Sequence, residues 1–385
     1  MDLWTASAAE GFFQRKPDDG YDPKAVGLCL SGGGYRATLF HAGAIIRLNE
    51  LKVLPRLSRI SSVSGGSICA GILGMGWKTL TFVDDVATNL REVFVRPCIK
   101  ATSRTLDIQV GIAGYLPFVS AGNYLSSLYD DHIFDGFRLR DLPAAPRFVF
   151  NATNLQTSGL IRFSRDTIAD WKAIMCRDHK VSLADAVAAS SAFPPVLAPL
   201  RLDLLEEKVE APEGAVFDDP ALRIRPVLVD GGVYDNLGLE TVWKRCGVII
   251  GSYAGFNMRS KPGNFDFGHL YPMVMSMTAA GVDWRERILV DLFQHILADG
   301  LPERRGVYWT ADTAMEKFAK HDGWKPSKAA LDRARDTPTR LQALDRDQQR
   351  TVIEAGYAFA DAGVRTRLLP DAPPPDGPPD LPFDD

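Results

Sequence analysis

Hydrophobic residues in this chain form short continuous runs separated by longer helical patterns. Apolar runs of strand length occur at residues 25–30, 59–63, 147–152, 226–229 and 247–250. Residues 37–51 follow the first run and residues 67–77 follow the second. Both segments carry apolar side chains on most faces of a helix, which is typical of buried helices. Strands that alternate with crossover helices build mainly parallel sheets covered on both faces. The pattern therefore predicts an α/β fold with a mainly parallel central sheet.

The two ends of the chain depart from this pattern. Residues 1–24 are polar and aromatic by turns and end in a turn-rich stretch, so we expect an N-terminal leader that lies over the domain. Residues 370–385 are mostly proline and aspartate, and such a composition buries too little apolar area to offset the entropy lost on ordering. We predict a disordered tail there. Residues 25–369 contain no repeat or linker and are expected to form one domain.

Composition and charge narrow the possible functions. The formal net charge is −4 and the basic residues are scattered, which predicts no nucleic-acid binding. The five cysteines are widely spaced without a CxxC pair, so we expect buried free thiols, no zinc site and a cytoplasmic location. The chain lacks a signal-peptide pattern and any apolar window of about 18 residues. Contact with lipid is therefore expected to be peripheral.

Three of the predicted strands are followed at once by residues with reactive or polar side chains. Ser31, Ser64 and Asp230 each stand where an apolar run ends. In sheets of this kind, functional groups gather beyond the carboxyl ends of the strands. We therefore expect these three residues to lie near one another.

The segment Ser-Val-Ser-Gly-Gly at residues 62–66 predicts a nucleophile elbow. A serine on a sharp strand-to-helix turn is exposed, and the helix N-terminus favours developing negative charge. Such a turn needs small neighbours, which Gly66 supplies. Ser64 is thus the candidate nucleophile, and a packing turn of small residues is the alternative.

The glycines at residues 32–34 predict an oxyanion loop. Gly32, Gly33 and Gly34 can aim consecutive backbone N–H groups at an anion, and losing one such donor costs about 3 kcal/mol of transition-state stabilisation. Arg36, in the following helix, either supports this loop with its positive charge or forms a structural salt bridge. The sequence leaves both roles open.

Asp230 is the candidate base for this serine. An ordinary aspartate, with a pKa near 3.9, is a weak base at neutral pH, so burial and hydrogen bonding to the serine have to raise its basicity. Gly231 and Gly232 permit close approach of the two loops. The alternative is an Asx turn at the end of a strand, and Asp235 is assigned to that turn rather than to the chemistry.

The six histidines offer no clear third member of a triad. His269 and His321 lie in loops that no strand precedes. His295 falls near an apolar helical face and is expected in the core or at its boundary, whereas His41 is expected to pack within the first helix. A two-residue pair of serine and aspartate is therefore preferred.

Residues 25–255 resemble the patatin-like phospholipase family. The resemblance rests on the glycine loop, the serine elbow, Asp-Gly-Gly at 230–232, and the Ala/Ser-rich segment 188–195 that ends in prolines. It implies a three-layer α/β/α domain over 25–369 in which Ser64 and Asp230 cleave lipid acyl esters without a metal or other cofactor. Two departures are Ser62, in place of the elbow's first glycine, and Ala37, in place of a glycine often found after the arginine.

Several alternatives and details stay open at this point. The glycine loop also matches a dinucleotide fingerprint, although Glu50, the acidic residue at about the expected spacing, falls within a helix. A non-catalytic partner-binding protein of the same fold is a further alternative. Residues 108–129 form either a lid that opens at a lipid surface or a helical insert packed on the core. Headgroup, acyl position and oligomeric state are not encoded in any recognisable pattern.

Overall fold

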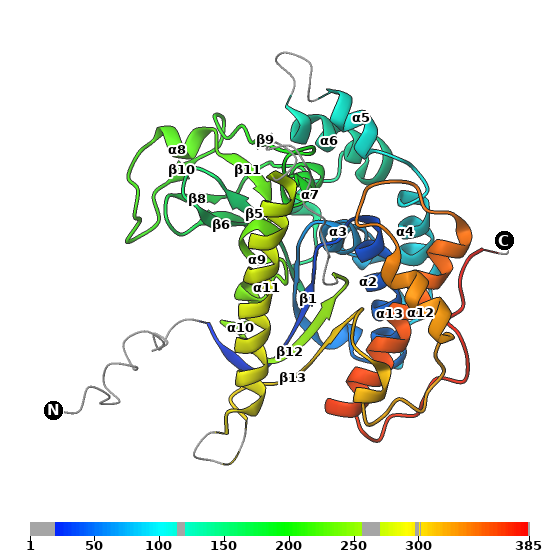
Figure 1. Ribbon diagram of the computed structural model, residues 1–385. Helices are drawn as coiled ribbons and strands as arrows, with labels where there is room; N and C mark the ends of the chain where they lie inside the picture. Colours follow the sequence, from blue (N-terminus) through cyan, green and yellow to red (C-terminus); the bar gives the residue numbers. More distant parts are fainter. Residues whose placement is uncertain (1–19, 114–119, 256–269, 297–299, 301, 384–385) are drawn as a thin grey trace.

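The computed structural model describes residues 20–113, 120–255, 270–296, 300 and 302–383 of the chain. Most of the predicted leader, residues 1–19, lies outside the described residues. Figure 1 shows a central sheet with helices packed on both of its faces. The predicted three-layer α/β/α architecture is confirmed.

The centre of the sheet is parallel, as the hydrophobic pattern predicted. Its strands lie in the order β5, β2, β1, β12, β13, and every neighbouring pair among them is parallel. Strand β1 begins before the predicted run, so the last residues of the expected leader join the sheet. The bounds are β5 (Arg147–Asn154), β2 (Leu57–Ser62), β1 (Asp22–Leu30), β12 (Cys246–Tyr253) and β13 (Arg305–Thr310).

An antiparallel extension continues the sheet beyond β5, which the sequence pattern did not predict. Strands β6, β7 and β8 follow β5 through short turns, and every pair in this extension is antiparallel. Strand β11 pairs antiparallel with β5 as well. The bounds are β6 (Gly159–Phe163), β7 (Thr167–Asp170), β8 (Ile174–Arg177), β10 (Val209–Glu210), β9 (Leu200–Arg201) and β11 (Val227–Asp230); a separate hairpin joins β3 (Phe82–Val83) and β4 (Val86–Ala87).

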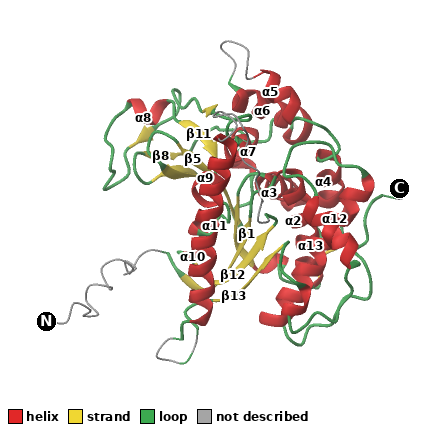
Figure 2. Cartoon of the chain, in the orientation of Figure 1, coloured by secondary structure: helices red, strands yellow, loops and turns green. Residues whose placement is uncertain are grey.

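Two hydrophobic clusters hold the helices on opposite faces of the sheet. Leu28 and Leu30 of β1 belong to the larger cluster with α2, α3 and α13, whereas Cys29 belongs to the smaller one with α10 and α11. Figure 2 shows the parallel strands between these two groups of helices. The helices are α2 (Gly34–Glu50), α3 (Gly65–Gly76), α4 (Arg96–Ala101), α5 (Asp107–Ala113), α6 (Ala121–Tyr129), α7 (Leu183–Ser191), α8 (Ala221–Ile224), α9 (Gly232–Asp235), α10 (Glu240–Trp243), α11 (Leu270–Gln294), α12 (Lys328–Asp336) and α13 (Arg346–Arg367).

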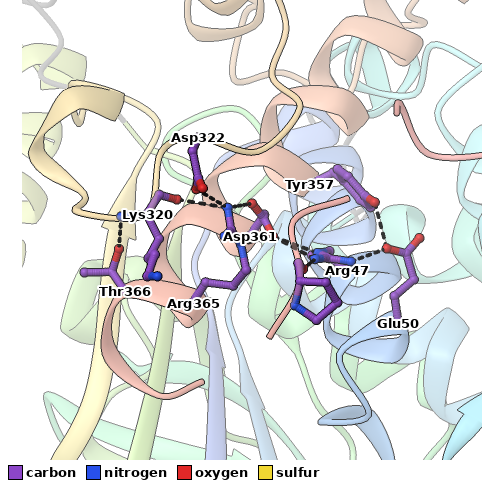
Figure 3. A network of polar contacts seen from close by, with 9 residues as sticks. Arg47, Glu50, Lys320, Asp322, Tyr357, Asp361, Arg365 and Thr366 are labelled. Carbon is purple, nitrogen blue, oxygen red and sulfur yellow. Dashed lines mark hydrogen bonds and ion pairs between the residues drawn. The ribbon is translucent and has the colours of Figure 1, made fainter. Parts of the chain in front are cut away.

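Helices α2 and α13 pack closely enough to exclude side chains at their crossing. A Cβ atom at Gly43 would lie 1.9 Å from the Ile353 carbonyl oxygen. Beside the crossing, a buried network joins the helices (Figure 3): Arg47 Nε and Arg365 Nε each donate to Asp361 Oδ1 over 2.9 Å. Because the charges are mutually hydrogen-bonded, their burial is tolerated.

The C-terminal segment packs against the domain, in contrast to the predicted disordered tail. Leu381 and Phe383 are buried, and the guanidinium of Arg350 lies 5.1 Å from the Phe383 ring centroid. Arg47 Nη2 also donates to the Pro373 carbonyl over 2.8 Å. Leu381 and Phe383 are two apolar anchors that the average composition does not reveal. The prolines also restrict the unfolded chain and so reduce the entropy lost on ordering.

The cysteines and the long helices bear on two further expectations. All five cysteines are buried free thiols, as predicted. None of the described helices is both long and apolar enough to cross a membrane.

Candidate active site

The register along β5 brings the serine elbow and Asp230 together. On one side of β5, parallel strand β2 ends with Ser62 opposite Phe150. On the same side, antiparallel strand β11 ends with Asp230 opposite Ala152, because the other side of β5 is occupied by β6. The two strands therefore meet end to end, and the elbow after β2 faces the carboxylate that ends β11.

Ser64 adopts a strained backbone conformation at the N-terminus of α3. Its φ is 51° and its ψ is −123°, a region that costs a residue with a side chain on the order of 1–3 kcal/mol. Its backbone N–H donates to Ser190 Oγ over 3.0 Å. Gly66 permits the turn, since a Cβ there would lie 2.4 Å from the Leu30 carbonyl oxygen.

A buried hydroxyl network supports the elbow from behind. Ser190 Oγ donates to the Asn151 carbonyl over 2.6 Å, and Asn151 Nδ2 donates to the Ser62 carbonyl over 2.9 Å. Ser67 Oγ donates to Ser62 Oγ over 2.9 Å, so the serine that replaces the usual glycine is part of this network. Asn151 and Ser190 lie far from the elbow in the sequence. No sequence pattern indicated Asn151, and only the alanine- and serine-rich segment 188–195 indicated Ser190.

Asp230 is buried, and its surroundings favour the protonated form. Burial raises its pKa to about 7, although the Gly232 N–H and the nearby Ser64 side chain act in the opposite direction. The Gly232 N–H lies 2.7 Å from Asp230 Oδ1. A carboxyl group with a pKa near neutrality can accept a proton from a hydroxyl far more readily than an ordinary aspartate.

The glycines after Asp230 allow the close approach that the sequence suggested. A Cβ at Gly231 would lie 2.2 Å from the Asn151 carbonyl oxygen, and one at Gly232 would lie 2.6 Å from Asn236 Oδ1. Asp235 belongs to the turn, as assigned, since its carboxylate accepts the Leu237 N–H over 3.1 Å.

The glycine loop lies beside Ser64, but only part of it is available to bind an anion. The Gly32 N–H donates to the Asn236 carbonyl over 3.2 Å, so the predicted donor role of Gly32 is corrected. Neither Gly33 nor Gly34 donates its N–H to an acceptor in the described chain, and their φ values of 138° and 57° lie in the left-handed region that favours glycine. Gly32 still lies against Ser64, since a Cβ there would be 3.1 Å from Ser64 Cβ.

Arg36 has a structural role in the described contacts. Its buried guanidinium donates from Nη1 to the carbonyl oxygens of Arg335 and Thr337 over 2.8 and 3.0 Å. Burial lowers its pKa to about 10. Arg36 thus fastens the C-terminal end of α12 beside the glycine loop.

His41 supports the same loop through hydrogen bonds as well as packing. Its Nε2 lies 3.0 Å from the Ser31 carbonyl and its Nδ1 lies 2.9 Å from Ser252 Oγ. Burial lowers its pKa to about 4, so the ring is neutral, with the proton on the nitrogen that faces the carbonyl.

His295 and His321 have hydrogen-bond partners other than the serine and the aspartate. His295 is exposed rather than in the core or at its boundary, and its Nδ1 lies 3.1 Å from Glu303 Oε2. The prediction for His295 was wrong because Ile288 and Ile296, two apolar residues of the same predicted helical face, are exposed and not in the core. His321 Nδ1 lies 2.6 Å from the Phe318 carbonyl, and His269 lies outside the described residues.

A cavity of about 680 Å³ opens at Ser64 and Asp230. Its walls combine the glycine loop with apolar side chains from the segment after α7 and from α11. The lining residues include Ser64, Asp107, Asp230, Val196, Leu197, Met275, Arg36 and Arg340. Among the described residues, no group of three or more His, Cys, Asp or Glu side chains could hold a metal ion.

The segment that the sequence left as lid or insert is described only in part. Val110 of α5 and Leu125 of α6 are buried in the core, whereas Ile108 and Ile112 are exposed. Residues 114–119 lie outside the described residues. The two helices thus pack as an insert with one apolar edge facing solvent.

The chain resembles known proteins in sequence and in fold. A family model of patatin-like phospholipases matches residues 28–243. Human GIVD cytosolic phospholipase A2 is similar in structure, with 13% identity and a TM-score of 0.53 over 91% of this chain and 59% of that one. Its complex with methyl gamma-linolenyl fluorophosphonate gives 13% identity and a TM-score of 0.51 over 92% and 59%.

At 13% identity, the structural similarity shows that the two proteins share a fold and no more. The chain covers about three fifths of the human phospholipase chain. No curated protein matches the sequence.

Proposed function

Since the chain belongs to the patatin-like phospholipase family, we propose that it is a lipid acyl ester hydrolase of the phospholipase or lysophospholipase type. Ser64 is the nucleophile and Asp230 the base of a catalytic dyad. The observation that carries this proposal is the end-to-end meeting of β2 and β11, which sets a buried carboxyl of raised pKa beside a strained serine.

The reaction proceeds in two steps through an acyl-enzyme. Asp230 takes the proton of the Ser64 hydroxyl as Oγ attacks the ester carbonyl, and the N–H groups of Gly33 and Gly34 stabilise the oxyanion. Collapse breaks the ester bond, and the leaving alcohol takes the proton from Asp230. Water then attacks the acyl-serine, gives a proton to Asp230, and releases the fatty acid as Ser64 recovers its proton.

The substrate is proposed to lie in a lipid surface that the protein contacts peripherally, without entering the membrane. Exposed apolar side chains border the cavity on separate elements. Val196 lines the cavity, and a Cβ at Gly111 of α5 would lie 3.2 Å from its Cγ1. On α11, Met275 lines the cavity, and Met273 and Met277 are exposed on another face of the same helix. A cytoplasmic location is part of this proposal.

Fatty-acid release from mixed phospholipid and monoacyl-lipid vesicles tests the proposal, with Ser64→Ala as the comparison. Release should be lost in Ser64→Ala and retained in Ser126→Ala, a change on α6 outside the dyad. EDTA should leave release unchanged. Release that survives in Ser64→Ala would exclude Ser64 as nucleophile.

A covalent probe tests the nucleophile independently of turnover. Methyl gamma-linolenyl fluorophosphonate, found in complex with the human structural neighbour, carries a phosphorus that an activated serine attacks with loss of fluoride. Mass spectrometry should locate the adduct on Ser64. A folded protein that remains unlabelled would argue for a binding role of this fold instead.

A further inference from the structure

Among the described residues, two that line the cavity are cationic, Arg36 and Arg340, and their contacts differ. Arg36 is buried and holds the carbonyl oxygens of Arg335 and Thr337. Arg340 also lines the cavity, and its side chain is 57% exposed. We infer that Arg340 binds the phosphate of a glycerophospholipid headgroup, an inference that rests on the proposed function and narrows its substrate class.

The backbone of Arg340 is fixed against the glycine loop. The Tyr35 N–H donates to the Arg340 carbonyl over 3.0 Å, and a Cβ at Gly34 would lie 2.6 Å from that same oxygen. Arg36 holds the chain just before it. The base of the Arg340 side chain is therefore kept beside the proposed oxyanion site.

A carboxylate orients the guanidinium group. Arg340 Nε donates to Asp107 Oδ2 over 2.7 Å, and the Asp107 side chain is buried. The segment before Asp107 is itself anchored, because the Leu106 N–H donates to the Leu341 carbonyl over 2.8 Å. Only Nε is used in this contact. Within the described chain the two Nη groups donate to no acceptor, which leaves a pair of parallel donors for an anion.

This arrangement suits a phosphate better than a neutral headgroup. Two Nη groups of one guanidinium can bind two oxygens of a phosphate at once, and a bidentate contact of this kind is both strong and directional. In a glycerophospholipid, a short glycerol spacer separates the phosphate from the scissile ester. With the ester at Ser64, the acyl chain lies along Val196, Leu197 and Met275, and the phosphate reaches Arg340. A diacylglycerol has no group for this contact.

The test compares two soluble short-chain lipids with the same acyl chains, a phosphatidylcholine and a diacylglycerol. Both are used as monomers, so that binding to a lipid surface does not enter the result. Arg340→Gln should lower the ratio of kcat/KM for the phospholipid to that for the diacylglycerol by about 10-fold, mainly through KM, since hydrogen bonds to charged groups are lost. Arg340→Lys should give a ratio between those of the wild type and Arg340→Gln, because lysine keeps the positive charge but lacks the two parallel N–H donors of a guanidinium.

Arg225→Gln is the matched control. Arg225 is also largely exposed and pairs with one carboxylate, Asp203, over 3.4 Å, but it does not line the cavity. Its variant should keep the wild-type ratio. An unchanged ratio in Arg340→Gln, or equal losses on both lipids, would overturn the inference and leave Arg340 with a structural role.

A binding measurement separates this inference from the proposed function. In a Ser64→Ala background, calorimetric titration with a short-chain diether phosphatidylcholine requires no catalysis. Adding Arg340→Gln should weaken its binding about 10-fold and leave binding of the matching diether glycerol closer to the parent value. If the wild type hydrolyses neither lipid, the proposed function fails while this titration still decides the role of Arg340: equal affinities with and without Arg340 would overturn it.

Discussion

Ser62 and Asp230 end two strands that run toward each other along the same side of β5, where they pair with Phe150 and Ala152. One residue of β5 lies between these two positions. The separation between the elbow and the carboxylate is therefore set by backbone hydrogen bonding to a single strand. Because a sheet register is shared by several hydrogen bonds, it holds the pair more rigidly than flexible loops would.

Replacing Asp230 by asparagine should remove the base and preserve the fold. We expect kcat for lipid hydrolysis to fall about 10³-fold, within the range typical of a lost general base. In the wild type, kcat/KM should rise with pH to a half-maximum near pH 7, because the deprotonated carboxylate accepts the proton and its pKa is about 7. Steady-state kinetics from pH 5 to about 9 checks both; a variant of unchanged kcat would exclude Asp230 as base.

The same substitution should change how stability depends on pH. Since the pKa of Asp230 is about 7 in the folded protein and 3.8 ordinarily, the folded state binds more protons between these values. Its stability therefore falls as pH rises through this window, by at most about 4 kcal/mol at 1.36 kcal/mol per pKa unit. Asp230→Asn should be the more stable protein at pH 8, and chemical denaturation at pH 5 and 8 measures the difference.

Gly66→Ala should disturb the elbow by steric overlap. The new Cβ would lie 2.4 Å from the Leu30 carbonyl and 2.6 Å from the Ser31 carbonyl, and backbone cannot yield as a flexible side chain does. We expect a loss of about 1–3 kcal/mol in the free energy of unfolding, together with lower activity. Gly281→Ala in α11 is the control: its Cβ would meet only Arg285 Nη1 at 3.4 Å, so stability should hold or improve. Equal effects of the two changes would contradict the steric explanation.

His41→Phe should leave the Ser31 carbonyl and the Ser252 hydroxyl without their imidazole partner. Each buried group left unpaired costs about 1–3 kcal/mol, and the glycine loop should lose order with them. In the wild type, the pKa of His41 is about 4 against an ordinary 6.5, so its contribution to stability is present above pH 6.5 and is lost as pH falls toward 4. Denaturation curves at pH 7 and 5 should show the gap between wild type and variant narrowing at the lower pH.

Phe383→Ala should destabilise the domain although the residue lies near the chain end. The side chain is buried and lies under the Arg350 guanidinium, and truncating a buried phenylalanine costs about 3–5 kcal/mol when the site is fully enclosed. Leu205→Ala, at an exposed apolar residue, should change the melting temperature little. A melting temperature unaffected by Phe383→Ala would mean that the segment does not pack against the domain in solution.

Much of the fold followed from hydrophobic periodicity. The runs at 25–30, 59–63 and 247–250 became β1, β2 and β12, because a continuous apolar run between buried helices has few other ways to be covered. The strands from β6 to β10 did not follow, since they are short and part-polar and are stabilised by pairing with neighbours. The C-terminal segment was wrongly predicted to be disordered for a related reason. That prediction rested on average composition, whereas the order of the segment depends on two buried residues, Leu381 and Phe383.

The sequence by itself determined the serine elbow, the glycine loop and the aspartate, because a tight turn and a close backbone approach depend on residue type within a few positions. Only the tertiary structure decided that β11 runs antiparallel to meet β2, that Gly32 gives its N–H to Asn236, and that Ser190 accepts the backbone N–H of Ser64. It also decided that Arg340 lies beside the glycine loop. These relationships join residues far apart in the chain, and they follow from strand register and packing, which no local pattern encodes.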